Sequence, residues 1–224
     1  MIHYHCSDIN PHSKLLDLSG RHLLVSHAYP RSIEIAHQIA QTVLLDNGAF
    51  SVWKSGSVAD WAGYYDWTNQ WFNYSTTWAI IPDVINAGDE AQDELVKQWP
   101  HGDRGSPVWH LDEKLDRLLR LVNEWPRVCL GSAGEYDVIN SDKWRNRMDI
   151  VFNMLHCRFR MPWIHGLRMQ GVVGYPFGSV DSADIARNNN RPQNSIKKMA
   201  ERWDARQPTL WTTRPIQHEL NNVR

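Results

Sequence analysis

Short apolar runs recur along the chain, and each is followed by a turn rich in Gly, Pro, Asp or Asn and then by a more polar segment. The eight runs are Ile2–Cys6, Leu23–Tyr29, Thr42–Asp46, Trp78–Pro82, Val108–Leu111, Val128–Gly131, Ile164–Met169 and Phe177–Asp181. Strands that alternate with helices predict βαβ units around a parallel sheet. Eight such units predict an α/β fold, a compact (β/α)8 barrel of the TIM type.

The polar segments between the runs carry the periodicity of helices. The clearest cases are the amphipathic stretches 112–124, 142–159 and 196–206. In the first of them, Leu118 and Val122 lie one helical turn apart on the apolar face, as a helix packed against a sheet requires.

The connection between the seventh and eighth runs is short. Only Gln170–Pro176 separates them, whereas a parallel crossover usually needs about a dozen residues or more. Either the barrel is irregular near its last strands, or one of the two runs is not a strand. No domain boundary is visible, so residues 1–206 are expected to form a single barrel domain. Residues 207–224 are expected to form a C-terminal tail that is poorly ordered or lies on the surface.

Composition narrows the class of protein. The 224 residues contain no run of eighteen apolar positions, which argues against a membrane span. The first residues lack a basic segment followed by an apolar stretch, so an intracellular, cytoplasmic protein is expected. Three cysteines are too few for a disulfide scaffold or a four-cysteine zinc site.

The net charge of −1 conceals an uneven distribution. Residues 1–126 carry 9 Lys/Arg and 16 Asp/Glu, whereas residues 127–224 carry 15 and 9. The basic half either faces phosphates or reflects ordinary helix surfaces. The twelve tryptophans leave a similar choice between core packing, which is the more common role, and stacking surfaces for bases.

Polar or glycine-rich groups follow several of the predicted strands. Asp46, Asp83 and Asp181 each stand at the end of a run, as do His110 and the segment Gly131–Glu135. An aspartate in this position is usually a helix cap or a turn residue. However, the carboxyl ends of parallel barrel strands share one face, and that face carries catalysis in TIM barrels. Three acids that converge there predict an active site with perturbed pKa values.

The sequence offers no clear metal or cofactor site. His3, His5 and Cys6 lie close together, but no carboxylate or further histidine follows at ligand spacing. Neither a Walker loop nor a GxGxxG segment after a strand is present. We therefore expect neither a metal nor a cofactor.

Five segments together resemble the tRNA-guanine transglycosylase superfamily. Leu44–Phe50 (LLDNGAF) is similar to its Asp-Ser-Gly-Gly-Phe motif, and Trp78–Val84 to the following strand with a base-reading aspartate. Cys129–Glu135 resembles the Gly-Gly-Leu-x-Val-Gly-Glu segment, while His165–Gly171 and Phe177–Ser182 resemble the late strands. The order matches, and the Ser-Val-Asp-Ser form is closest to the DNA 7-deazaguanine branch of phages and bacteria.

The resemblance implies base exchange without a cofactor. Asp181 would attack the anomeric carbon of a guanine nucleotide and form a covalent glycosyl-enzyme. Asp46 would act as general acid/base, and Asp83 would accept hydrogen bonds from the guanine edge. The residues that would complete the base pocket are Phe50 and Met169 on its two faces, Gly131, Ser132 and Ala133 at the carbonyl edge, and His110, which stands where the family often has glutamine.

One departure from the family concerns the nucleic acid. Its tRNA enzymes carry a three-cysteine zinc site with a later histidine, whereas no cysteine follows Cys157 here. DNA is therefore the favoured partner and tRNA the alternative, with a free 7-deazaguanine base as the second substrate. Two other classes stay open: a barrel glycoside or nucleoside hydrolase that uses Asp46, Asp83 and Asp181, and a non-catalytic nucleic-acid-binding barrel.

Overall fold

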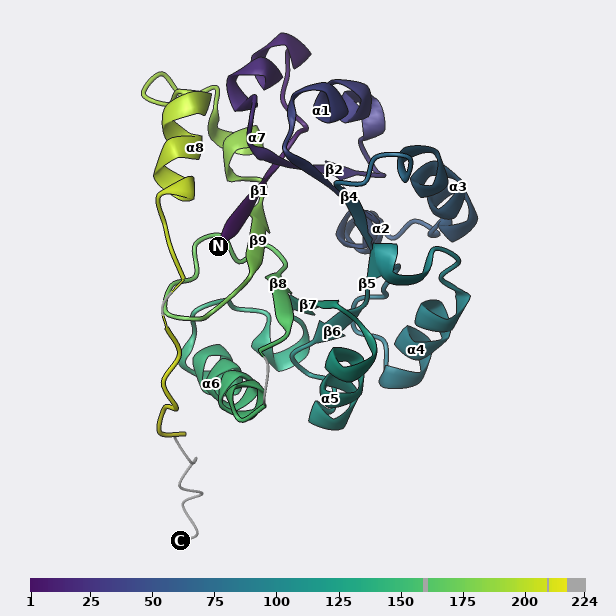
Figure 1. Cartoon of the computed structure of the whole chain (residues 1–224), viewed down its shortest axis with the longest axis vertical. Helices are drawn as coiled ribbons and strands as arrows, with labels where there is room; N and C mark the ends of the chain where they lie inside the picture. Colours follow the sequence, from purple (N-terminus) through teal and green to yellow (C-terminus); the bar gives the residue numbers. More distant parts are fainter. Residues whose placement is uncertain (159–160, 209, 217–224) are drawn as a thin grey trace, which may run out of the picture.

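The structure, a computed structural model, describes residues 1–158, 161–208 and 210–216. Within these residues, nine parallel strands form one sheet with the order β5-β4-β3-β2-β1-β9-β8-β7-β6. Their bounds are β1 Ile2–Cys6, β2 His22–Ser26, β3 Thr42–Asp46, β4 Thr77–Ile80, β5 Gly105–Ser106, β6 Val108–His110, β7 Arg127–Gly131, β8 Trp163–Gly166 and β9 Ser179–Ser182. The first and last strands pair, and Figure 1 shows the strands arranged in a ring with helices outside it. The predicted α/β barrel is confirmed.

Strands β5 and β6 are two halves of one extended segment, interrupted at Pro107. Proline has no N–H to donate to a ladder, but the Pro107 carbonyl accepts a hydrogen bond from Cys129 N at 2.9 Å. Strand β5 pairs with β4, and β6 pairs with β7. The eight predicted runs therefore all contain strands, and the nearly closed barrel has its seam at this proline.

The helices are α1 Ile33–Ile39, α2 Ala49–Ser55, α3 Trp61–Trp71, α4 Asp89–Gln98, α5 Leu115–Glu124, α6 Asp142–His156, α7 Asp184–Asn188 and α8 Ile196–Asp204. Most of them cover the outside of the barrel, whereas α2 lies at the carboxyl ends of the strands, directly after β3. Short 3-10 turns lie at η1 His12–Leu18, η2 Pro30–Ser32, η3 Gly102–Arg104 and η4 Gly134–Tyr136. The amphipathic segments predicted at 112–124, 142–159 and 196–206 correspond to α5, α6 and α8. The last predicted residue of the second segment lies outside the described residues.

The irregularity expected near the last strands is present. Strand β8 ends at Gly166, earlier than predicted, and the connection to β9 contains no helix. Val172, Tyr175 and Phe177 from this connection are buried with residues of α6 in one apolar cluster. The connection between β8 and β9 thus contributes to the apolar core although it contains no helix.

The barrel interior is packed with side chains rather than open. Tyr4, Leu44, Trp78 and Cys129 belong to an interior cluster. The Tyr4 hydroxyl lies 2.9 Å from Thr42 Oγ1 and accepts a hydrogen bond from Trp78 Nε1 at 2.8 Å. These side chains fill the middle of the barrel, and two cavities among the described residues lie at its two ends.

Most of the described tryptophans serve packing, although Trp53 and Trp163 are exposed. The side chains of Trp109 and Trp144 are fully buried in the layer between strands and helices. Trp211, in the segment after α8, is also buried and stacks on Tyr175 with ring centroids 5.5 Å apart. The end of the predicted tail, residues 217–224, lies outside the described residues.

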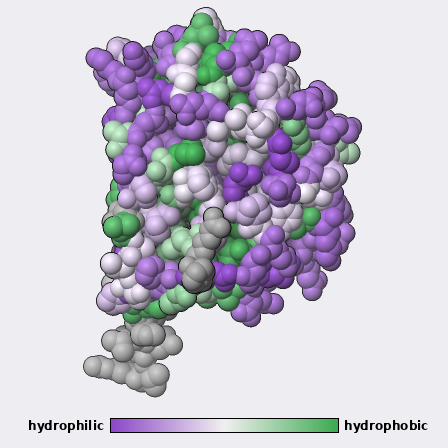
Figure 2. Space-filling model, viewed as in Figure 1, coloured by the Kyte–Doolittle hydropathy of each residue, from purple (hydrophilic) through white to green (hydrophobic). Residues whose placement is uncertain are grey.

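The surface seen in Figure 2 is mostly hydrophilic, and its apolar residues are scattered rather than gathered in one patch. In the part of the chain that the structure describes, we find no helix with the length and apolarity needed to cross a membrane.

Candidate active site

A cavity of about 330 Å³ lies at the carboxyl ends of the barrel strands. Its wall brings together Asp46 at the end of β3, Asp83 after β4 and Asp181 in β9. It also contains His110, Phe50, Gly131, Ser132 and Ala133, so that every predicted site residue except Met169 lines the cavity. Asn47, Trp53 and Arg168 are among the lining residues that the sequence did not single out. Its volume is at the lower end of the range for ligand pockets.

Met169, which the resemblance places on one face of the base, does not line the cavity. Its side chain is fully buried in the apolar cluster beside Phe177, outside the cavity wall. The preceding residue, Arg168, has a positive φ of 60°, which is unusual for a residue other than glycine. This bend sends Met169 into the core and leaves Arg168 and Leu167 on the cavity wall.

The Asp83 carboxylate is held from both sides. Oδ1 accepts a hydrogen bond from Asn47 Nδ2 at 2.8 Å, and Oδ2 lies 3.0 Å from His110 Nε2. Asn47 is fixed in turn, because it donates to the Ile81 carbonyl at 2.9 Å and accepts from Ala49 N at 2.8 Å. Each carboxylate oxygen has a second lone-pair direction, so Asp83 can still accept hydrogen bonds from a ligand.

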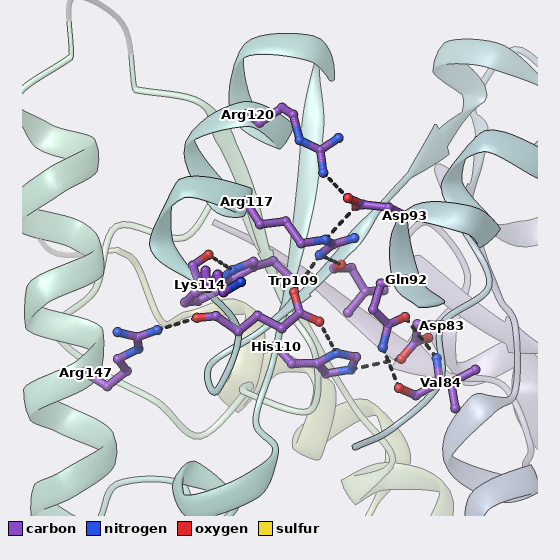
Figure 3. Close-up of polar contacts among 12 residues, drawn as sticks. Asp83, Val84, Gln92, Asp93, Trp109, His110, Lys114, Arg117, Arg120 and Arg147 are labelled. Atoms are coloured by element: carbon purple, nitrogen blue, oxygen red, sulfur yellow. Dashed lines mark hydrogen bonds and ion pairs between the residues drawn. The ribbon is translucent and has the colours of Figure 1, made fainter. Parts of the chain in front are cut away.

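His110 lies between two buried carboxylates (Figure 3). Its Nδ1 is 2.9 Å from Glu113 Oε1, and its Nε2 faces Asp83. Burial lowers the pKa of His110, but the hydrogen bonds and charges of Asp83 and Glu113 outweigh it and raise the pKa to about 10. The ring therefore carries two protons and donates to both acids. Because both nitrogens are engaged, His110 positions Asp83 and offers a ligand only ring carbons.

The network continues away from the cavity through α5. Arg117 Nη1 donates to Glu113 Oε2 at 2.6 Å and to the Val108 carbonyl at 2.9 Å, while its Nε donates to Asp93 at 2.8 Å. Arg120 also binds Asp93 (Figure 3). Charges of alternating sign thus run from Asp83 to the surface, which compensates the desolvation of each buried charge.

Asp46 sits in a different environment. Burial raises the pKa of its carboxyl to about 6, and the charges of Asp181 and Asp83 add to this shift. Hydrogen bonds from Ser26 and Gly48 N oppose it. Gly48 has a φ of 76°, and a Cβ there would lie only 3.3 Å from Ala28, so glycine suits this turn on both counts. A carboxyl with a pKa near neutrality is suited to both giving and taking a proton.

Asp181 leaves one oxygen available to the cavity. Its Oδ1 accepts a hydrogen bond from Arg168 N at 2.7 Å and lies 3.3 Å from His165 Nε2. His165 is buried and its Nδ1 lies 2.8 Å from Ser179 Oγ. Among the described residues, none hydrogen-bonds Asp181 Oδ2. An oriented carboxylate with one oxygen free of hydrogen bonds has the geometry of a nucleophile.

The histidines near the N-terminus do not belong to this cavity. His3 and His5 face α8, where His5 Nε2 lies 2.9 Å from Asp204 Oδ1. Burial lowers the pKa of His5 to about 4, and strand alternation directs Cys6 to the opposite face. The described residues contain no group of three or more His, Cys, Asp or Glu side chains that could hold a metal ion.

Several site residues escaped the sequence analysis. Glu113 and Arg117 are spaced four residues apart, a signal typical of a helical ion pair. No comparable local signal marks Asn47, His165 or Arg168, because each acts through a partner distant in sequence. Comparison of the chain with protein-family models, curated proteins and solved structures finds no match.

Proposed function

We propose that this protein is a guanine transglycosylase that exchanges a guanine in nucleic acid, with DNA favoured over tRNA, for a 7-deazaguanine base. The observation that carries the proposal is the convergence of Asp46, Asp83 and Asp181 in one cavity with three different sets of partners. Different environments let identical groups take different roles at one pH.

In the proposed reaction, an oxygen of Asp181 forms a bond to C1′ of the sugar as the bond from C1′ to N9 of guanine breaks. The electron pair of the broken bond moves to the base, which receives a proton from Asp46. The incoming base then gives its proton to Asp46 and displaces Asp181 from C1′. A carboxylate suits this exchange, because the transition state is cationic at the sugar.

Asp83 supports selection of guanine. A carboxylate accepts two hydrogen bonds from the adjacent N1–H and exocyclic amine, a pair of donors that adenine lacks. Because His110 and Asn47 already hold the Asp83 carboxylate, binding of the base costs little further side-chain entropy at this residue. Phe50 offers an aromatic face, and Gly131, Ser132 and Ala133 line the same cavity.

The experiment that tests the proposal is incorporation of labelled guanine into DNA and, in parallel, into tRNA. Incorporation into DNA is the expected result, and incorporation into tRNA alone would make tRNA the substrate. Release of guanine with no incorporation would instead indicate a hydrolase, because water would then resolve the covalent intermediate. Binding of DNA with neither release nor incorporation would indicate a non-catalytic barrel.

A further inference from the structure

Arg168 connects two sides of the candidate active site. Its backbone N–H holds Asp181, and its guanidinium carbon lies 4.0 Å from the centroid of the Phe50 ring. The two residues come from the β8–β9 connection and from α2, so this contact crosses the mouth of the cavity. Among the described residues, no carboxylate lies within 4 Å of the Arg168 guanidinium nitrogens.

Arg168 and Phe50 contact each other directly in the structure, so a flat base could stack between them only after the two side chains separate. A guanidinium is planar and stacks on aromatic rings and on bases. A flat base that enters between Arg168 and Phe50 would exchange their contact for two stacked faces. Arg168 thus occupies the position that the sequence motif assigned to Met169, and it places a positive charge there instead of a neutral thioether.

We propose that Arg168 is a catalytic residue that stacks on the purine and stabilises the negative charge of the departing base. This inference rests on the proposed function. When the bond between C1′ and N9 breaks, its electron pair moves onto the purine before the proton from Asp46 fully compensates it. A cation fixed over the ring interacts with this charge more strongly in the transition state than in the ground state, which lowers the barrier.

The side chain can be changed without removing the hydrogen bond to Asp181, because every residue except proline keeps the backbone N–H. Arg168→Met removes the charge and the planar group but keeps an unbranched, polarizable side chain that can still contact the face of a base. Arg168→Lys keeps the charge but also lacks the planar group. Arg31→Met is the matched control, since Arg31 is exposed on η2 and does not line the cavity.

The variants are tested by exchange kinetics on a DNA oligonucleotide and by equilibrium dialysis of free 7-deazaguanine. For Arg168→Met, we expect kcat to fall by about tenfold or more, while base affinity falls only about two- to fivefold. The kcat of Arg168→Lys should lie between those of Arg168→Met and the wild type. Arg31→Met should match the wild type.

A second readout separates charge stabilisation from a structural role. Replacing N7 by carbon removes an electron-withdrawing atom, so 7-deazaguanine is a poorer leaving group than guanine. The rate loss in Arg168→Met should therefore be larger when 7-deazaguanine leaves. Equal losses for both bases, or a kcat within twofold of the wild type, would overturn the inference and leave the proposed function intact. A wild-type protein without exchange or base binding would overturn both.

Discussion

Removing the Glu113 carboxylate tests whether Asp83 and Glu113 together keep His110 doubly protonated at neutral pH. His110 has a pKa of about 10, compared with 6.5 for an unperturbed histidine. This difference corresponds to about 4 kcal/mol of stability at pH 7. Asp83 and Glu113 both contribute to this stabilisation, so Glu113→Gln should lower the free energy of unfolding by about 2 kcal/mol. The charge of buried Arg117, which then lacks this partner, adds to the loss.

The pH dependence of the stability loss distinguishes loss of the His110 charge interaction from poor packing of the new side chain. Because the pKa of His110 is higher in the folded than in the unfolded protein, its contribution is complete below pH 6.5 and is lost as the pH rises to about 10. Urea unfolding of the wild type and of Glu113→Gln at pH 7 and pH 10 measures this contribution to the free energy of unfolding. Glu124→Gln on the same helix removes only an exposed pair with Arg120 and should cost less than about 1 kcal/mol. A loss for Glu113→Gln that is equal at both pH values would refute the reasoning.

Three further changes separate the roles of the cavity residues. Asp46→Asn should abolish exchange. It should also raise the thermal midpoint at pH 7, because burial raises the pKa of Asp46 and its ionised form destabilises the fold. This gain in the midpoint should shrink as the pH falls from about 6 to 3.8. Asp83→Asn should weaken guanine binding measured by dialysis, since an amide places a donor where the base also donates, while the protein stays folded by circular dichroism. Met169→Leu should leave exchange kinetics unchanged and cost less than about 1.5 kcal/mol in urea unfolding, because Met169 packs in the core.

The barrel could be predicted because its strands are short apolar runs whose ends are marked by turn residues. The runs Ile2–Cys6 and Thr42–Asp46 match β1 and β3 at both ends. Predicted strand ends were too late at Tyr29 and Met169, since apolar residues continue past the last ladder pair there. The break at Pro107 depends on which neighbour each half meets, and that is a property of the closed ring rather than of the local sequence.

The candidate site could be predicted only in part. The three aspartates were found because strand ends in a parallel barrel share one face. The function of His110 could not be found in this way, because its pKa depends on Asp83, which follows a different strand. The exchange of places between Met169 and Arg168 depends on one positive φ at a residue other than glycine. No local sequence pattern marks that conformation.

The most direct test of the central claim is capture of the covalent intermediate at Asp181. Wild-type protein incubated with guanine-containing DNA, with the released base removed, should yield a protein–DNA adduct that survives denaturing electrophoresis. Asp181→Asn keeps nearly the same volume but replaces the carboxylate by a poor nucleophile. It should stay folded, form no adduct and lose exchange by several orders of magnitude. An Asp181→Asn protein that exchanges guanine at near the wild-type rate would contradict the account and pass the nucleophilic role to Asp46.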